Sequence, residues 1–177
     1  MKYLLIICVI FLGCTDNRPL DSDDFEVSPR FEVNLFQIQY PTLLINVGYD
    51  SIPSPNTIRQ FVNTDFLNEQ FNADYLKSLE FKFLAENSIN TPQTFKFTFF
   101  DADGVETLTI THSIAGGNES SPQTERFADP YTTQSDIEKI TNSVELEVFF
   151  SQPSQASNNG IMNLECVIEA GYLYTGE

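Results

Sequence analysis

The chain has 177 residues, of which 41% are hydrophobic, and it carries 25 Asp and Glu against 9 Lys and Arg, a formal net charge of −16 at pH 7. A chain this acidic, with no cluster of Lys and Arg, repels a phosphate backbone, so nucleic acid is excluded as a partner. It is also repelled by an anionic membrane surface, so membrane attachment would have to come from a covalent lipid.

The first 13 residues are typical of a secretory leader. Lys2 supplies a positive start, and an apolar run follows from Tyr3 to Leu12. This run is too short to cross a hydrocarbon core of about 30 Å, which takes about 20 apolar residues in a helix. The junction Leu12-Gly13-Cys14 resembles the bacterial lipobox. The resemblance implies that the leader, residues 1–13, is removed and that Cys14 becomes an acylated N-terminus. A plain secreted protein is the alternative.

Residues 14–29 form a polar, acidic tether without apolar periodicity, which is expected to be disordered. Within it, Ser22, Asp23, Asp24, Phe25 and Glu26 resemble the acidic export signal of surface lipoproteins of Bacteroidota. The resemblance implies that the protein is anchored in the outer membrane and faces the cell exterior. The alternative is an acidic linker in a lipoprotein that faces the periplasm. Leader removal takes away one basic residue and no acidic one, so the net charge becomes −17.

Three cysteines are present. Cys8 lies in the leader and Cys14 is assigned to lipid, so Cys166 has no partner for an intramolecular disulfide. Stability must therefore come from packing, for which the chain supplies 16 Phe and 7 Tyr but no Trp.

The body, residues 30–177, has the length of one domain with a single core. Alternation of apolar and polar residues predicts strands over 31–40, 43–49, 79–87, 94–99, 108–110, 144–150 and 162–170. The first of these changes parity at Phe36, which indicates a bulge or a bend that passes the strand to a second sheet. Helical spacing over 64–78 predicts a short helix capped by Thr64 or Asp65. Ser135 to Glu138 resembles a capping box for a second helix ending near Thr141.

Asp101 to Gly104 predicts a hairpin turn, whereas 114–122 and the segment to Gln134 are expected to be irregular. About seven short strands with one or two helical insertions predict a mainly β fold, an antiparallel β-sandwich of immunoglobulin-like type.

No motif in the chain predicts a catalytic site. Asp101 to Glu106 places three carboxylates together, but it lacks the spacing of a calcium-binding EF-hand, and Asp-Gly favours a turn. His112 is the only histidine and has no nucleophile motif near it. Cys166 has the inward parity of a core residue. A pair of carboxylates for glycoside hydrolysis is not excluded, but the sequence singles out no such pair. No cofactor and no metal are predicted.

Four apolar residues fall on the parity opposite the core, which predicts an exposed patch for docking a protein partner or, alternatively, positions covered by a helix or loop. They are Phe36, Phe100, Phe149 and Val167.

Three functions remain. The first is a non-enzymatic accessory or structural subunit of an outer-membrane β-barrel complex for uptake, export or assembly, in contact with a barrel protein or other surface lipoproteins. The second is a glycan-binding module. The absence of Trp is unfavourable for it, although four tyrosines could stack on sugars: Tyr40, Tyr131, Tyr172 and Tyr174. The third is an enzyme.

Overall fold

The structure, a computed structural model, describes residues 26–49 and 54–175 and divides into two units. The smaller unit holds a two-stranded antiparallel ladder of β1 (Glu26–Val27) and β10 (Tyr174–Thr175). Glu26 and Val27, which the sequence places in a disordered tether, therefore pair with another strand. The larger unit, Ser28–Leu173, contains all the long strands.

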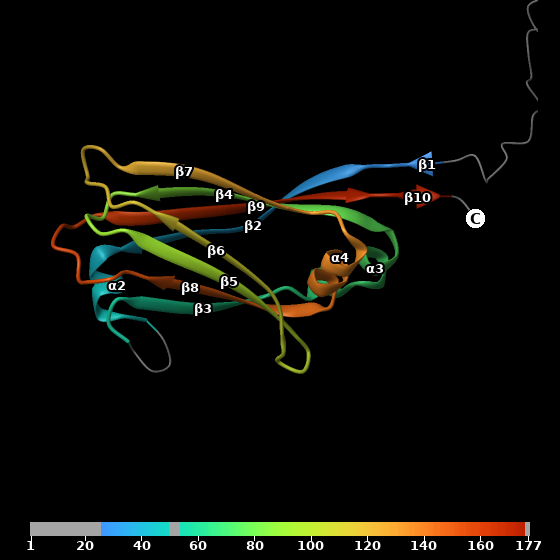
Figure 1. Ribbon diagram of the computed structural model, residues 1–177, viewed down its shortest axis with the longest axis horizontal. Helices are drawn as coiled ribbons and strands as arrows, with labels where there is room; N and C mark the ends of the chain where they lie inside the picture. The colour runs from blue at the N-terminus through green and yellow to red at the C-terminus, as the bar shows by residue number, and fades with distance from the viewer. Residues whose placement is uncertain (1–25, 50–53, 176–177) are drawn as a thin grey trace, which may run out of the picture. The chain divides into compact units, whose positions relative to one another are not determined.

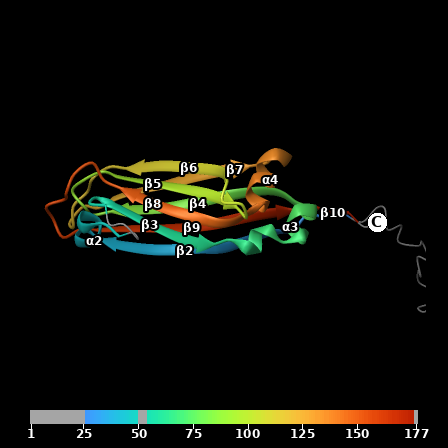
Figure 2. The ribbon, with the colours of Figure 1, turned by 90° about the horizontal axis from the view of Figure 1, so that it is seen from below.

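This larger unit is an antiparallel β-sandwich, which confirms the predicted fold class (Figure 1). One four-stranded sheet has the order β2-β9-β4-β7, and the other has the order β3-β8-β5-β6. Figure 2 shows the strands of the two sheets running along a common direction. The strands are β2 (Arg30–Pro41), β3 (Thr57–Asn63), β4 (Leu76–Asn87), β5 (Gln93–Asp101), β6 (Glu106–Ile114), β7 (Gln123–Tyr131), β8 (Ser143–Ser151) and β9 (Ile161–Tyr172).

The strand pairs are nested in the chain. The hairpin β5–β6 is innermost, β4 pairs with β7 around it, β3 pairs with β8 around both, and β2 pairs with β9 outermost. A nested antiparallel ribbon that is rolled into two sheets of four strands is a jelly roll, which refines the immunoglobulin-like expectation. The outermost pair brings residues near the start of the body to residues near its end, as in Arg30 opposite Gly171.

The core between the sheets is built from phenylalanines on facing strands. Phe83 on β4 stacks on Phe97 on β5 at 4.7 Å between ring centroids, and Phe81 lies 5.3 Å from Phe99. The alternation that predicts β4 and β5 arises because Phe81, Phe83, Phe97 and Phe99 all point inward and are buried.

The segment predicted as a strand over 43–49 is instead a helix, α2 (Thr42–Val47). A short apolar run fits a strand and a buried helical turn equally well by periodicity. Tertiary hydrogen bonds favour the helix here. The Thr42 hydroxyl donates to the carbonyl of Gly160 at 2.8 Å, and the Asn46 side chain donates to the carbonyl of Ala156 at 2.9 Å.

The expectation that 123–131 is irregular is also wrong, because these residues form β7. Its inward positions carry an acid and an aromatic residue in turn, so the apolar signal is weak; they are Glu125, Phe127, Asp129 and Tyr131. Pro130 weakens it further. An edge strand tolerates both proline and inward acids, because only one of its sides is paired.

β2 has the predicted irregularity, a register shift between Asn34 and Phe36. The predicted transfer to a second sheet is wrong, because β2 pairs with β9 on both sides of the shift. The bulge inserts one residue and thereby moves the inward parity of β2 from the odd-numbered positions before it to the even-numbered positions after it.

The predicted helix over 64–78 is shorter and is broken into η2 (Asp65–Asn68) and α3 (Gln70–Tyr75). Thr64 precedes η2 but its side chain caps no backbone group. The helix near Thr141 is confirmed as α4 (Gln134–Thr141), although its cap is Thr133, whose side chain accepts from the backbone N–H of Asp136.

We predict that Phe97→Ala lowers the free energy of unfolding by about 3–5 kcal/mol, because it leaves a cavity in the aromatic layer. The matched control is Phe61→Ala on β3, since Phe61 is 55% exposed and Phe97 is 1% exposed. The control should change the free energy by only about 0.5 kcal/mol in urea unfolding. Equal losses in the two variants would contradict this account of the core.

Candidate docking surface

The lipidation residue Cys14 and the export-signal residues Ser22, Asp23, Asp24 and Phe25 lie outside the described residues. Glu26, the last residue of that signal, is exposed in β1. No helix within residues 26–49 and 54–175 is long and apolar enough to span a membrane.

The four residues predicted to form a docking patch do not form one. Phe100 and Phe149 lie on the outer face of the β3-β8-β5-β6 sheet, where Phe149 is opposite Lys96 and Phe100 is opposite Glu145. The pair Glu147 and Thr98 lies between those two rows. Val167 belongs to the other sheet, on β9 opposite Lys82. All three side chains are half-buried.

Phe36 is on the core side, so its assignment to the outer face is wrong. It lies opposite the buried Cys166, and its ring stacks on Phe97 at 5.5 Å between centroids. The reason is the bulge at the preceding residue, which turns the even-numbered positions of β2 inward.

The candidate calcium segment is a hairpin turn. The Asp101 side chain accepts hydrogen bonds from the backbone N–H groups of Asp103 and Val105, at 3.0 and 2.8 Å. Gly104 supplies the positive φ of 74° that the turn requires. Across the part of the chain that the structure describes, no three His, Cys, Asp or Glu side chains are arranged to hold a metal ion.

His112 joins the two sheets. It lies on β6, stacks on Phe127 of β7 at 4.3 Å between ring centroids, and places Nε2 2.6 Å from Oδ2 of Asp129. The contact closes the β6–β7 side of the sandwich. Cys166 is fully buried, and burial raises the pKa of its thiol, as for a core residue.

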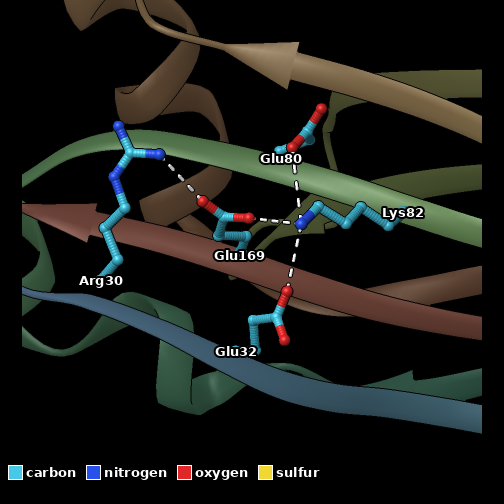
Figure 3. A network of polar contacts seen from close by, with 5 residues as sticks. All are labelled: Arg30, Glu32, Glu80, Lys82 and Glu169. Atoms are coloured by element: carbon cyan, nitrogen blue, oxygen red, sulfur yellow. Dashed lines mark hydrogen bonds and ion pairs between the residues drawn. The ribbon is translucent and has the colours of Figure 1, made fainter.

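An ion cluster occupies the outer face of the β2-β9-β4-β7 sheet (Figure 3). Glu32, Glu169 and Glu80 form one row, because Glu169 is opposite both of the others on neighbouring strands. Lys82 contacts all three: it bonds to Glu169, lies 3.1 Å from Glu32 and lies 3.9 Å from Glu80. Arg30 approaches Glu169 at 3.1 Å. Three carboxylates therefore share two cations.

These contacts shift the pKa values of Glu169 and Lys82. Hydrogen bonds from Lys82 and Arg30 hold the pKa of Glu169 below its ordinary value, and hydrogen bonds to Glu169 and Glu32 raise the pKa of Lys82. The cluster is most favourable when the glutamates are ionised.

An exposed apolar surface lies at the start of β2. Phe31 and Val33 occupy the inner parity, opposite the buried Ala170 and Ile168, yet they are 54% and 48% exposed. The ring of Phe31 is 5.8 Å from that of Tyr172, and Phe71 on α3 is 5.4 Å from the same ring. We call Phe31, Val33, Phe71, Tyr75 and Tyr172 the Phe31–Phe71 surface.

Hydrogen bonds fix this surface in place. The Tyr172 hydroxyl donates to the side-chain oxygen of Asn72 at 2.7 Å, and the Asn72 amide donates to the carbonyl of Phe66 at 2.7 Å. Burial, with the nearby charge of Glu69, raises the pKa of Tyr172, so the hydroxyl stays a donor at neutral pH. Phe71, 55% exposed, packs on Tyr75 at 5.1 Å between centroids.

The tyrosines considered for glycan binding are placed less favourably. Tyr40 is only 4% exposed and donates to the side chain of Gln60. Tyr131 and Tyr172 are half-buried, and burial raises the pKa of Tyr131 to about 12. Tyr174 alone among the four is exposed.

The sequence pattern assigned Phe31 and Val33 to the correct face but did not show that they are uncovered. Coverage depends on which strands are at the edges of the sheets, and no local pattern encodes that order. The helical spacing of Phe71 and Tyr75 identified their helix but not its neighbours.

No family model matches the sequence, and no curated protein is significantly similar to it. Among solved structures, a protein from Parabacteroides distasonis described as secreted has a TM-score of 0.46 at 8% identity, over 64% of this chain and 36% of that one. The VP2 subviral particle protein of infectious bursal disease virus has a TM-score of 0.40 at 14% identity, over 84% and 38% of the two chains. This chain thus spans well under half of either protein. These similarities concern the fold alone.

We predict that Glu169→Gln makes stability less sensitive to acid. A carboxyl with a lowered folded pKa contributes stability that is present above its ordinary value of 4.5 and is lost as the pH falls through the folded pKa. Between about pH 6 and about pH 3, urea unfolding should show a smaller loss for Glu169→Gln than for the wild type. Glu86→Gln on the same sheet, outside the cluster, is the control. An identical acid loss in wild type and Glu169→Gln would refute the effect.

Proposed function

We propose that this protein is a lipid-anchored protein of the outer membrane that faces the cell exterior and acts, without catalysing a reaction, as an accessory subunit of an outer-membrane β-barrel complex for uptake, export or assembly. The single observation that carries the docking role is the Phe31–Phe71 surface, where Phe31 and Phe71 are both more than half exposed. Large apolar side chains gathered in one place on a soluble, acidic domain favour a protein contact.

Two sequence features support the location. The junction at Cys14 provides the acyl anchor, and Ser22 to Glu26 provides the acidic signal for surface display. The surface lies close to the anchor along the chain, because Phe31 follows Cys14 by 17 residues. An extended segment of that length reaches about 60 Å, so the tether allows the domain to contact a protein in the same membrane.

The rigidity of the surface also supports docking. Its aromatic side chains have few rotatable bonds, and the hydrogen bond from Tyr172 to Asn72 orders the centre before a partner arrives. A pre-ordered aromatic surface loses little conformational entropy on binding.

We predict that Cys14→Ala abolishes outer-membrane attachment, because the acylated thiol is lost and two or three acyl chains are what hold such a protein stably. Fractionation and labelling with a fatty-acid probe measure the result. The control replaces Ser22 to Glu26 with alanine, which should keep the lipid but hide the domain from protease added to intact cells. A Cys14→Ala protein that still labels and fractionates with the outer membrane would refute lipidation.

We also predict that Phe71→Ser removes co-purification with an outer-membrane β-barrel protein while lowering the free energy of unfolding by about 1 kcal/mol. The control is Phe61→Ser, which removes an equally exposed ring from β3, outside the surface. The measurement is affinity purification of the full-length protein from solubilised membranes. Equal recovery of the barrel protein with Phe71→Ser and with wild type would exclude the surface as the docking site.

A further inference from the structure

The outer edge of β2 is open where the Phe31–Phe71 surface begins. β2 pairs with β9 on one side, and among residues 26–49 and 54–175 no strand pairs with its other side. Every second residue of such an edge turns its backbone N–H and C=O away from the sheet, ready to pair with another strand. The regular part before the bulge runs from Arg30 to Asn34.

This stretch lacks two devices that often protect an edge, namely proline and inward-pointing charge. It contains no proline, its inward positions are Phe31 and Val33, and neither inward position carries a charge. The edge strand β7 of the same sheet differs, because it carries Pro130 and the inward acids Glu125 and Asp129.

The outer face of the same edge carries more negative than positive charge, three carboxylates against two cations. Glu32, Glu169 and Glu80 stand in one row across three strands, and like charges directly opposite each other are unfavourable. Lys82 and Arg30 offset only part of this, and Glu32 ends the row at the open edge with its side chain 65% exposed. A positive side chain on a strand added beside β2 would lie opposite Glu32 and extend the row favourably.

We propose that the Arg30–Asn34 edge of β2 binds an extended segment of a partner protein as an added strand, with apolar residues opposite Phe31 and Val33 and a lysine or arginine opposite Glu32. The alternation follows from the pleat. Residues opposite Phe31 and Val33 extend the inner face and cover the exposed side chains, whereas the residue between them points to the outer face. Backbone hydrogen bonds supply affinity and the alternate side chains supply specificity.

The charge of the domain favours this partner over a second copy of the same chain. Glu69 at the start of α3 and Asp74 within it add negative charge next to the surface. Lys77 is the nearest base in the sequence after α3. Arg30 is already paired with Glu169. The whole chain carries −16, so a basic segment is attracted and an identical chain is repelled at long range. This inference deepens the proposed function and rests on it for the identity of the partner.

The test uses the purified full-length protein in detergent and two short peptides, Thr-Val-Lys-Val-Thr and Thr-Val-Glu-Val-Thr, each carrying a fluorophore for anisotropy. The wild type should bind the lysine peptide at least about fivefold more tightly than the glutamate peptide. Glu32→Lys should reverse this preference. Val33→Lys, which puts a charge at an inward position of the edge, should weaken binding of both peptides by about tenfold or more.

Phe61→Lys on the edge of the other sheet is the matched control and should bind like the wild type. Loss of secondary structure is checked by circular dichroism, and Val33→Thr, which retains the β-branched shape, should keep the lysine preference even if Val33→Lys is unstable. The proposal is overturned if neither peptide binds, if Glu32→Lys leaves the preference unchanged, or if Phe61→Lys is as damaging as Val33→Lys. Dimerisation of the wild type that Val33→Lys abolishes would also overturn it, because the edge would then serve a second copy.

The proposed function and the strand-addition proposal are tested by different experiments, so either can be refuted without the other. Membrane fractionation with Cys14→Ala and co-purification with Phe71→Ser test attachment and docking in cells. The peptide titration tests strand addition in the purified chain and does not depend on either result.

Discussion

The aromatic layer between β4 and β5 is the interaction on which the rest of the structure depends. No disulfide can form within the body, because Cys166 is its only cysteine. The stacked rings of Phe83 and Phe97, with Phe81 against Phe99, therefore supply the contact that holds the two sheets together. Rings of this size bury large apolar areas, so a few facing pairs account for much of the stability of a domain of this length.

The nested strand pairing determines where that layer ends. β4 and β9 are central in one sheet, and β5 and β8 are central in the other. The inward residues of these strands are covered on both sides, whereas β2 is left at an edge. Phe31 and Val33 thus follow the same alternation as Phe81 and Phe83 but remain about half exposed. The surface we assign to docking is the uncovered margin of the same apolar layer that forms the core.

The sequence predicted the elements whose signals are strong and local. The alternating phenylalanines of β5, the Asp-Gly turn at Gly104 and the alternation of β8 and β9 were all recognisable, as was the sandwich class. β7 was not predicted, because an edge strand accepts Glu125, Asp129 and Pro130 and its apolar pattern is therefore weak. α2 was predicted as a strand. Its helical form is stabilised by hydrogen bonds from Thr42 and Asn46 to a loop more than a hundred residues away in the chain.

The candidate site was less accessible to sequence reasoning than the fold. A bulge of one residue reversed the assignment of Phe36, and Phe100, Phe149 and Val167 were placed on outer faces without any means of telling which strands are neighbours. The exposure of Phe31 and the row of Glu32, Glu169 and Glu80 depend on strand order, which arises from long-range pairing. Side-chain pattern gives the face of a residue, whereas topology decides whether that face is covered.

The most direct test of the central claim is hydrogen–deuterium exchange of the backbone amides of Arg30–Asn34, compared between the protein bound in its native membrane complex and the purified protein. If a partner strand pairs with this edge, the amides that point away from β9 exchange more slowly in the complex, while those of the β3 edge are unchanged. Equal exchange of the Arg30–Asn34 amides in the two samples would contradict the account.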